Sequence, residues 1–325
     1  MKLKTNTLSV VIPTYNCLHL IKRHLAHLQN WIHLADEVIV VDSRSQDGTI
    51  DYIKKMIQHP RCLYIERDRG LYESWNEAIA ATSGDWIYIS TAGDIIDKNH
   101  LLRLMNAGIT SGADVVVSPQ RFVSEDGTPY QGTDYKNADF YHRLNKKKPT
   151  LLSPAAVWFF AFEKGKPNAL LGSCASDLFR GEFLRHRPFP TRYGTHGDTA
   201  WTLRHSSEMK LCVVPMAGAD FCIHPKEVAT PGVDLGKILN EIFINESKNA
   251  ETYLEKKFLA RWLFLSKLKA EAKDANQKRR EFRRKNKNNL FYIFTYLSYS
   301  LHYFLLCLKL YQKEKSFLKK YLYEI

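Results

Sequence analysis

The stretch YISTAGDII (residues 88–96) joins a predicted strand to a predicted polar site. It completes the apolar run WIYI (86–89), which predicts a strand buried on both faces. The small residues Ala92 and Gly93 follow, and they lead to a single carboxylate, Asp94. Ligands of open α/β sheets bind outside the carboxyl ends of the strands, so this stretch predicts such a sheet with a site at that edge.

The residues before this stretch alternate between strand-like and helix-like patterns. The predicted strands cover 8–13, 36–43, 62–68 and 85–91, and the predicted helices cover 18–32, 45–58 and 70–84. This alternation with short connections predicts an α/β fold with a doubly wound sheet flanked by helices. Thr14, Asp42, Asp68 and Asp94 stand at the ends of these strands, so we expect them at one edge, although any single one could instead cap a helix.

The second half of the chain is predicted to be less regular. One or two strands are expected in 113–123, loops in 124–155, a turn, strand and helix in 170–186, a loop and helix in 193–208, and one or two strands in 209–225. The helix in 193–208 is expected to begin at about Asp198.

The positive charge of the chain is concentrated at its C-terminal end. All of the net charge of +13 arises from residues 256–325, whereas residues 1–255 carry equal numbers of basic and acidic side chains. The charge therefore belongs to a tail and does not indicate that the body binds nucleic acid, and no nucleic-acid-binding motif is found in the tail.

The six cysteines lack C-x-x-C spacing, which argues against a zinc site or a disulfide scaffold and favours a reducing compartment. The first apolar run is interrupted by Pro13 too soon for a signal peptide, so we expect a cytoplasmic body.

No glycine follows the first predicted strand, where the sequence is PTYNCLHL (13–20). Nicotinamide-dinucleotide and P-loop proteins need a glycine-rich phosphate loop at this point, so both classes are excluded. A nucleotidyltransferase is disfavoured for the same reason.

Four motifs together resemble one enzyme family. They are VVIPTYN (10–16), VVDSRSQDGT (40–49), ERDRGLYESWNEAIAATSGDWIYISTAGDII (66–96) and GDTAWTLR (197–204). In this order they resemble the inverting family 2 glycosyltransferases with the GT-A fold, over roughly residues 8–225. The segment DRGLYESWNEAI followed by AGD is similar to the branch that builds bacterial surface polysaccharides.

The resemblance implies a mixed, doubly wound GT-A sheet flanked by helices. Residues 1–110 would be the nucleotide-sugar-binding half and 111–235 the acceptor-binding half of one domain, with 236–325 as a basic helical extension. It also implies transfer of a sugar from a nucleotide diphosphate sugar to a saccharide hydroxyl. UDP is the favoured nucleotide, because Asp42 matches the family acid that binds the base, typically uracil.

The resemblance assigns further donor-binding residues. Those carried over are Pro13, Thr14 and Tyr15 for the base and ribose, Arg44 for a phosphate, and Arg69, Gly70 and Asn76 beside the sugar diphosphate. Without it, Tyr15 could equally pack in the core and Asn76 could lie on a helix surface.

The family's metal-binding acids are reduced to one in this chain. Thr91, Gly93 and Asp94 occupy the matching positions, so only Asp94 would hold Mg²⁺ or Mn²⁺, with the diphosphate and water as the other ligands. Gly93 would let the backbone approach the diphosphate. His224 matches a position from which related enzymes sometimes contact the metal.

Asp198 matches the general base of the family, which takes the proton of the acceptor hydroxyl. It could instead be only the N-cap of its helix, and His196 is an alternative base. Arg204 and Asp177 are predicted contacts of a phosphate and of the acceptor, respectively.

The tail combines a basic stretch with an uncharged one. Residues 278–287 contain seven Lys or Arg, and the nineteen residues 290–308 contain no charged side chain. Because serine, histidine and tyrosine interrupt the uncharged run, we expect a helix on an anionic membrane surface and not across the bilayer. An ordinary helical hairpin is the alternative.

A membrane-bound tail favours a lipid-linked acceptor and a peripheral location on the inner face of the cell membrane. The competing hypothesis is a catalytically degenerate binding module that tethers a partner there. The sequence does not determine the sugar, and it leaves a homo-oligomer open.

Overall fold

The computed structural model describes most of the chain. The described residues are 6–130, 140–141, 144, 147–163, 166–167, 170–223, 235–248, 268, 271–282, 284, 300–309, 312–313, 316 and 322–324.

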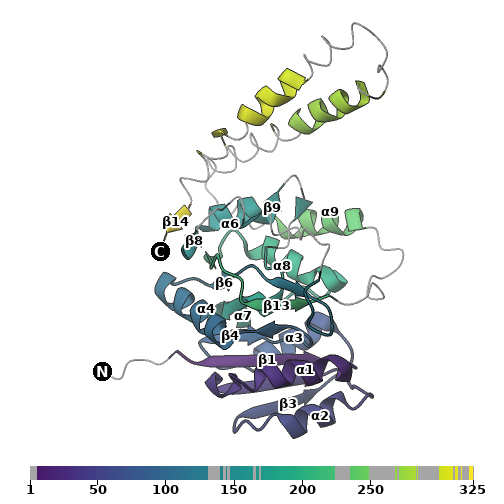
Figure 1. Ribbon diagram of the computed structural model, residues 1–325, viewed down its shortest axis with the longest axis vertical. Coiled ribbons are helices and arrows are strands. Elements are labelled where there is room, and N and C mark those ends of the chain that lie inside the picture. Colours follow the sequence, from purple (N-terminus) through teal and green to yellow (C-terminus); the bar gives the residue numbers. More distant parts are fainter. Residues whose placement is uncertain are drawn as a thin grey trace.

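A large mixed sheet runs through the body (Figure 1). Its strand order is β14-β8-β12-β6-β11-β4-β1-β2-β3. The bounds are β1 (Leu8–Thr14), β2 (Glu37–Asp42), β3 (Cys62–Glu66), β4 (Trp86–Ile89), β6 (Val115–Val117), β8 (Thr150–Leu152), β11 (Asp177–Arg180), β12 (Leu211–Val213) and β14 (Leu322–Glu324). Strands β1 to β4 are parallel, whereas β11 is antiparallel to both β4 and β6.

Two smaller sheets complete the strands. One has the order β5-β13-β7 and the other pairs β10 with β9. Their bounds are β5 (Ile95–Ile96), β7 (Arg121–Val123), β9 (Phe162–Glu163), β10 (Lys166–Pro167) and β13 (Ala219–Cys222).

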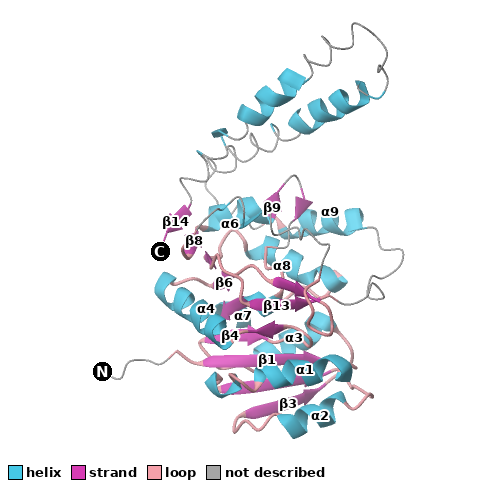
Figure 2. Cartoon of the chain, in the orientation of Figure 1, coloured by secondary structure: helices cyan, strands magenta, loops and turns pink. Residues whose placement is uncertain are grey.

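Helices cover both faces of the large sheet, as Figure 2 shows. The bounds are α1 (Leu18–Leu28), α2 (Thr49–Met56), α3 (Leu71–Ala80), α4 (Lys98–Ser111), α6 (Pro154–Ala161), α7 (Gly181–Arg185), α8 (Gly197–His205) and α9 (Leu235–Glu246), with 3-10 turns η1 (Ile32–Leu34), η2 (Cys174–Ser176) and η3 (Gly194–His196). Alternate residues of β1 serve the two faces. Val10 and Ile12 pack in a core with α1, α2 and α4, whereas Val11 packs in a core with α3, α6, α7 and α8. The predicted doubly wound α/β class is thereby confirmed.

The structure adds elements that the sequence did not predict. Strand β8 lies within residues 124–155, where we expected loops, and α6 begins there. Residues 156–161 of α6 are all buried. A helix covered on every side lacks the one-sided apolar period by which helices are recognised, which explains the omission.

The C-terminal segment is only partly separate from the body, unlike the tail expected for 236–325. Helix α9 packs on α8, and β14 pairs with β8. Between them, the helical residues 271–282 and 300–309 lie side by side and project from the body (Figure 1). The Arg279 guanidinium lies 5.0 Å from the Tyr303 ring centroid and connects these two helices.

The described helices include none that is both long enough and apolar enough to cross a bilayer. Residues 289–299, which hold much of the uncharged run of the tail, lie outside the described part of the chain.

Candidate active site

Asp42 lies at the end of β2 and is bonded to the end of the neighbouring strand. Its Oδ1 accepts hydrogen bonds from the hydroxyls of Thr14 (2.8 Å) and Ser45 (2.7 Å). Its Oδ2 accepts the Ser45 backbone N–H at 2.7 Å, which closes a turn after the strand. Asp42 is only 2% exposed, and Pro13, just before Thr14, is half-buried. This predicted base-binding acid is therefore rigidly positioned at the sheet edge.

Tyr15 and Arg69 come together beside this edge. The Arg69 guanidinium lies over the Tyr15 ring, 4.6 Å from its centroid. Tyr15 is 41% exposed, so it is not the core residue of the alternative interpretation. An exposed ring paired with a cation suits a stacked base and a nearby phosphate. Gly70, next to Arg69, is the N-cap of α3.

Arg44 has a left-handed backbone, with a φ of 55°. Its side chain turns toward β3 and forms ion pairs with Glu66 (3.4 Å) and Asp68 (2.6 Å). All three side chains are well exposed. Exposed pairs contribute little stability, so this arrangement is easily exchanged for a phosphate contact.

Asp94 connects three segments that are far apart in the sequence. Its Oδ1 accepts the backbone N–H of Cys222 at 2.8 Å, at the end of β13. Its Oδ2 accepts the hydroxyls of Thr91 (2.5 Å) and Ser173 (3.2 Å). Asp94 is 6% exposed. The carboxylate therefore holds the loop after β4 against β13 and the turn before η2.

Helix α1 supports the same loop from one side. Gly93 has a φ of 94°, which favours glycine, and its carbonyl accepts a hydrogen bond from the Arg23 guanidinium at 3.0 Å. The buried ring of His24 contacts the Asp94 carbonyl (2.6 Å) and the Ser90 hydroxyl (3.0 Å). Burial lowers the pKa of His24 to about 4, so the ring is neutral at pH 7.

Asp198 lies in the first turn of α8 and is half-buried. Its Oδ1 accepts the Thr199 backbone N–H at 2.6 Å. An N-cap residue bonds an N–H two or three positions further on, and His196 occupies the N-cap position here, so Asp198 is not simply a cap. Burial raises the pKa of Asp198 above its ordinary value, against the opposing effects of Thr199, His196 and the Tyr72 hydroxyl. A carboxylate with a raised pKa is a better proton acceptor.

Three carboxylates from separate segments converge on Cys174, in η2. The pKa of this buried thiol is raised well above its ordinary value, first by burial and then by the charges of Asp177, Asp198 and Asp94. Ser173, next to Cys174, donates to Asp94 at 3.2 Å, which connects η2 to the predicted metal ligand. The charge of Asp198, the predicted base, acts on the same thiol.

Asp177 begins β11 and is completely buried. Neither of its oxygens has a hydrogen-bond partner in good geometry, although the neighbouring Ser176 hydroxyl opposes the rise in the pKa of Asp177. Burial, reinforced by the charge of Asp198, raises the pKa of Asp177 well above its ordinary value.

Two other predicted ligand contacts are bonded to the protein itself. The Arg204 Nε donates to the buried Glu246 carboxylate of α9 at 2.5 Å, and not to a site facing Asp198. Asn76 bonds the backbone of Phe189 twice, through its Nδ2 to the carbonyl and its Oδ1 to the N–H, both at 2.8 Å. Both residues therefore fix the elements around Asp198 in this conformation.

The described residues contain no cluster of three or more His, Cys, Asp or Glu side chains that could hold a metal ion. His224 lies outside the described residues. An ion held here would take one carboxylate from Asp94, whose oxygens accept hydrogen bonds from Cys222, Thr91 and Ser173 in this conformation, and the oxygens of a bound diphosphate for the rest.

Sequence reasoning missed three residues around this site: Tyr72, Cys174 and Tyr141, whose hydroxyl is buried without a hydrogen-bond partner. Tyr72 could have been predicted from the sequence, because it lies in the same motif as Arg69 and Gly70. Cys174 carries no motif, and Tyr141 falls in a polar region for which we expected only loops.

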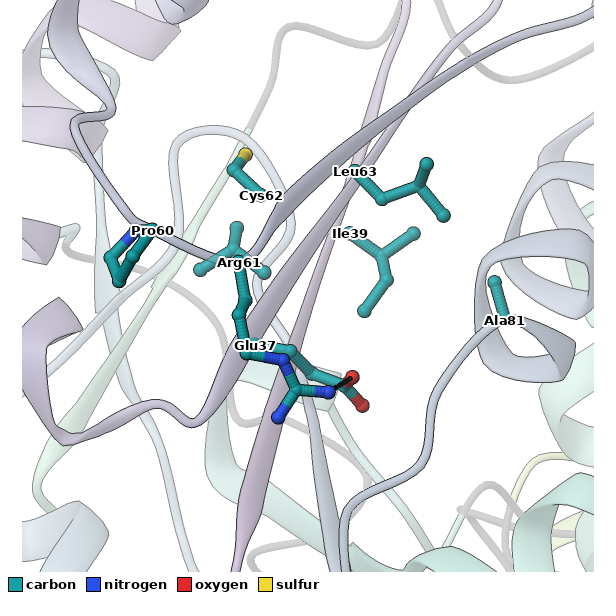
Figure 3. A pocket seen from close by; sticks show the side chains of 8 residues that line it. Glu37, Ile39, Pro60, Arg61, Cys62, Leu63 and Ala81 are labelled. Carbon is teal, nitrogen blue, oxygen red and sulfur yellow. Dashed lines mark hydrogen bonds and ion pairs between the residues drawn. The ribbon is translucent and has the colours of Figure 1, made fainter.

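A separate pocket lies away from this site. It has a volume of about 230 Å³ and lies at the amino ends of β2 and β3, against the end of α3 (Figure 3). An ion pair between Arg61 and the buried Glu37 crosses it at 3.0 Å. The candidate site is at the opposite end of these strands.

Comparisons with known proteins agree with the geometry. The family described as glycosyl transferase family 2 matches residues 9–166. The succinoglycan biosynthesis protein ExoO of Rhizobium meliloti (strain 1021) is 29% identical over 126 residues, which are 38% of this chain and 36% of ExoO. The chain aligns with between 36% and 49% of the length of the curated relatives it matches.

Solved structures share the fold. S. aureus TarS 1-349 in complex with UDP-GlcNAc has a TM-score of 0.57 at 17% identity, covering 79% of this chain and 71% of that one. The mannosyltransferase PcManGT from Pyrobaculum calidifontis has a TM-score of 0.50 at 21% identity, covering 69% and 58%. Residues 9–166 therefore match glycosyl transferase family 2, and the chain shares the GT-A fold of these solved structures.

Proposed function

We propose that the chain is an inverting glycosyltransferase of surface polysaccharide synthesis. It would move a hexose from a nucleotide diphosphate sugar, with UDP favoured, to a hydroxyl of a saccharide. The observation that carries the proposal is the family 2 match over residues 9–166, which includes Asp42 and Asp94, with Asp94 bonded to Ser173 beside Cys174. UDP-GlcNAc in TarS and GDP-Man with Mn²⁺ in PcManGT support the class of donor.

Asp198 is the proposed general base. The acceptor oxygen bonds to the anomeric carbon while its proton passes to the Asp198 carboxylate. The bond from that carbon to the diphosphate oxygen breaks, and the nucleoside diphosphate leaves with the electron pair. Attack from the side opposite the leaving group inverts the anomeric configuration.

A divalent cation, Mg²⁺ or Mn²⁺, would neutralise the leaving diphosphate when bound. Asp94 would hold it, and His224 is the other proposed ligand. Asp42 would accept a hydrogen bond from the base, and Tyr15 and Arg69 would contact the base and phosphate.

The variant Asp198→Asn tests the base. It keeps the shape of the side chain but removes its basicity, so turnover should fall at least 10³-fold. Binding of the nucleotide sugar, measured by calorimetry, should stay within about threefold. Asp51→Asn, on the exposed side of α2, is the matched control. Undiminished turnover in Asp198→Asn, or a product with retained configuration by NMR, would contradict the mechanism.

We further propose that the acceptor is lipid-linked and that the chain binds the inner face of the cell membrane. Leu301, Phe304, Leu305 and Leu308 are spaced as one helical face, and each is between 42% and 60% exposed. The neighbouring helix, residues 271–282, contains four basic and three acidic residues, and three of the basic ones are consecutive at 278–280. An apolar stripe beside basic side chains fits an anionic interface.

Sedimentation with vesicles tests this membrane proposal. Wild type should pellet with vesicles of phosphatidylglycerol and phosphatidylcholine, and less with phosphatidylcholine alone. Combining Phe304→Ser with Leu305→Ser should reduce the bound fraction about tenfold or more. Leu63→Ser, an exposed leucine of β3, should have no effect. The proposal would be refuted if the double variant and Leu63→Ser bound vesicles equally well. It would also be refuted if the apolar stripe mediated self-association of the protein in solution.

A degenerate binding module remains the second candidate function. It is favoured by the single acid, Asp94, in place of the family's pair. A module would bind nucleotide sugar without turnover in a panel of UDP-, GDP- and dTDP-sugars, assayed with and without Mn²⁺.

A further inference from the structure

We propose that Asp177 and Tyr141 form a subsite that binds hydroxyl groups of an uncharged sugar beneath Asp198. The inference rests on the proposed glycosyltransferase function and specifies the chemistry of its substrate.

The position of Asp177 is set by the sheet. Strand β11 runs antiparallel between β4 and β6, and Asp177 pairs with Val117 at the carboxyl end of β6. In the same register, Phe179 pairs with Ile87 of β4. The first residue of β11 therefore lies at the edge to which β4 delivers Asp94.

Both groups lack partners in the described structure. Asp177 is 0% exposed, and neither of its oxygens is hydrogen-bonded. The hydroxyl of Tyr141 is also buried without a hydrogen bond. Leaving a buried polar group unpaired costs about 1–3 kcal/mol, and native proteins contain few such groups. Of the nine described residues that hold a buried polar atom without a partner, Asp177 is the only carboxylate, and a buried carboxylate with both oxygens unpaired indicates a role other than stability.

Tyr141 packs against the core that contains Cys174 and Val117, and Val117 is the strand partner of Asp177. The charge of Asp177 is among the causes that raise the pKa of Tyr141, after burial. The charge of Asp198 similarly acts on Asp177. Asp177 is fully buried and Asp198 is partly exposed, so Asp177 lies deeper in the site.

The chemistry of the pair matches a hydroxyl. Burial and the charge of Asp198 raise the pKa of Asp177 well above its ordinary value, which favours the acid form; that form both donates and accepts hydrogen bonds. The phenol of Tyr141 does the same. Sugar hydroxyls also have both capacities, whereas a carboxylate of a uronic acid would face repulsion from Asp198 and Asp94. Asp177 is covered in this conformation, so a sugar reaches it only if neighbouring side chains move.

Two variants separate hydrogen bonding from packing. Asp177→Leu and Tyr141→Phe remove the polar groups but retain apolar bulk. Asp177→Asn keeps a neutral donor and acceptor, and we expect it to restore binding to within about threefold of wild type. Asp177→Leu and Tyr141→Phe should each weaken the affinity for the sugar about tenfold, which is the effect of losing one hydrogen bond.

Calorimetry and kinetics distinguish whether the bound hydroxyl belongs to the donor sugar or to the acceptor. If the donor sugar occupies the subsite, the variants weaken UDP-glucose, UDP-galactose or UDP-N-acetylglucosamine but leave UDP unchanged. If the acceptor occupies it, donor binding is unchanged and the KM for the acceptor rises. If the variants bind the donor with wild-type affinity and have a wild-type KM for the acceptor, the subsite proposal is refuted. A wild-type protein that binds none of the donors would instead overturn the proposed function, and the subsite with it.

Thermal unfolding gives a readout that does not depend on any ligand. Because Asp177 is buried without a partner, Asp177→Leu should raise Tm by several degrees. Ser118→Ala is the matched control, since this buried hydroxyl bonds His100 at 2.8 Å and its removal should lower Tm. A lower Tm for Asp177→Leu would show that Asp177 has a structural role and would refute the proposal.

Discussion

Asp94 combines a proposed ligand role with a structural one, and two substitutions separate them. Asp94→Ala removes the acceptor of the Cys222 N–H, which is buried, and of the Thr91 and Ser173 hydroxyls. Asp94→Asn keeps an oxygen for Cys222, and the two hydroxyls can rotate to bond the new amide. Both variants lose the negative charge.

The expected free energies of unfolding follow from these contacts. An unpaired buried N–H costs about 1–3 kcal/mol, and each lost hydrogen bond to a hydroxyl adds roughly 0.5–1.5 kcal/mol. Asp94→Ala should therefore lose about 2–5 kcal/mol, and Asp94→Asn about 1 kcal/mol or less. At about 2–4 °C per kcal/mol for a domain of this size, the alanine variant should melt roughly 5–15 °C lower.

Urea unfolding and transfer activity should be measured on the same preparations. If Asp94 acts as proposed, transfer is lost in both variants, although only Asp94→Ala is clearly destabilised. Asp51→Ala, which removes an exposed acid of α2, should stay within about 0.5 kcal/mol of wild type. Equal stability of wild type and Asp94→Ala would refute the structural role, and full activity of Asp94→Asn would refute the ligand role.

Three further predictions concern the elements around the site. Asn76→Ala should lose about 1–3 kcal/mol, because it breaks two bonds to the Phe189 backbone, whereas Asn76→Asp should retain one of them in urea unfolding. Glu246→Gln should lower the free energy of unfolding by about 1–2 kcal/mol and speed hydrogen exchange in α9. The loss is small because the arginines paired with Glu246 are partly exposed. Burial lowers the pKa values of His24 and His205 to about 4, so the folded state binds fewer protons than the unfolded state between pH 4 and 6.5. Stability should therefore fall as pH drops through this window; His24→Gln should reduce the slope, and an unchanged pH profile would contradict this.

The first half of the fold was predictable because each of its strands is a buried run followed by an amphipathic helix. Strand β2 was expected at 36–43 and is observed at Glu37–Asp42. The second half was not predictable in the same detail. Strands β8 and β12 have only three residues each, too few to show a period, and α6 is apolar on all sides.

The site was predictable only where a motif marks it. Asp94 and Asp198 follow from their motifs, and the structure shows Asp94 bonded to Ser173 beside Cys174. The partners of Asn76 and Arg204 could not be predicted, because they lie 113 and 42 residues away in sequence. The isolation of Asp177 is also invisible in the sequence, since a residue without partners leaves no pattern.

The pairing of β14 with β8 affects how the protein should be shortened for experiments. A truncation that removes the projecting helices together with residues 322–324 also strips one neighbour from β8 and leaves its backbone groups open to pairing with other chains. Such a shortened protein would tend to aggregate, and its loss of function could be mistaken for loss of a membrane anchor. Replacing the two projecting helices by a short linker between α9 and β14 would keep β14 paired with β8. Affinity tags are better attached at the N-terminus.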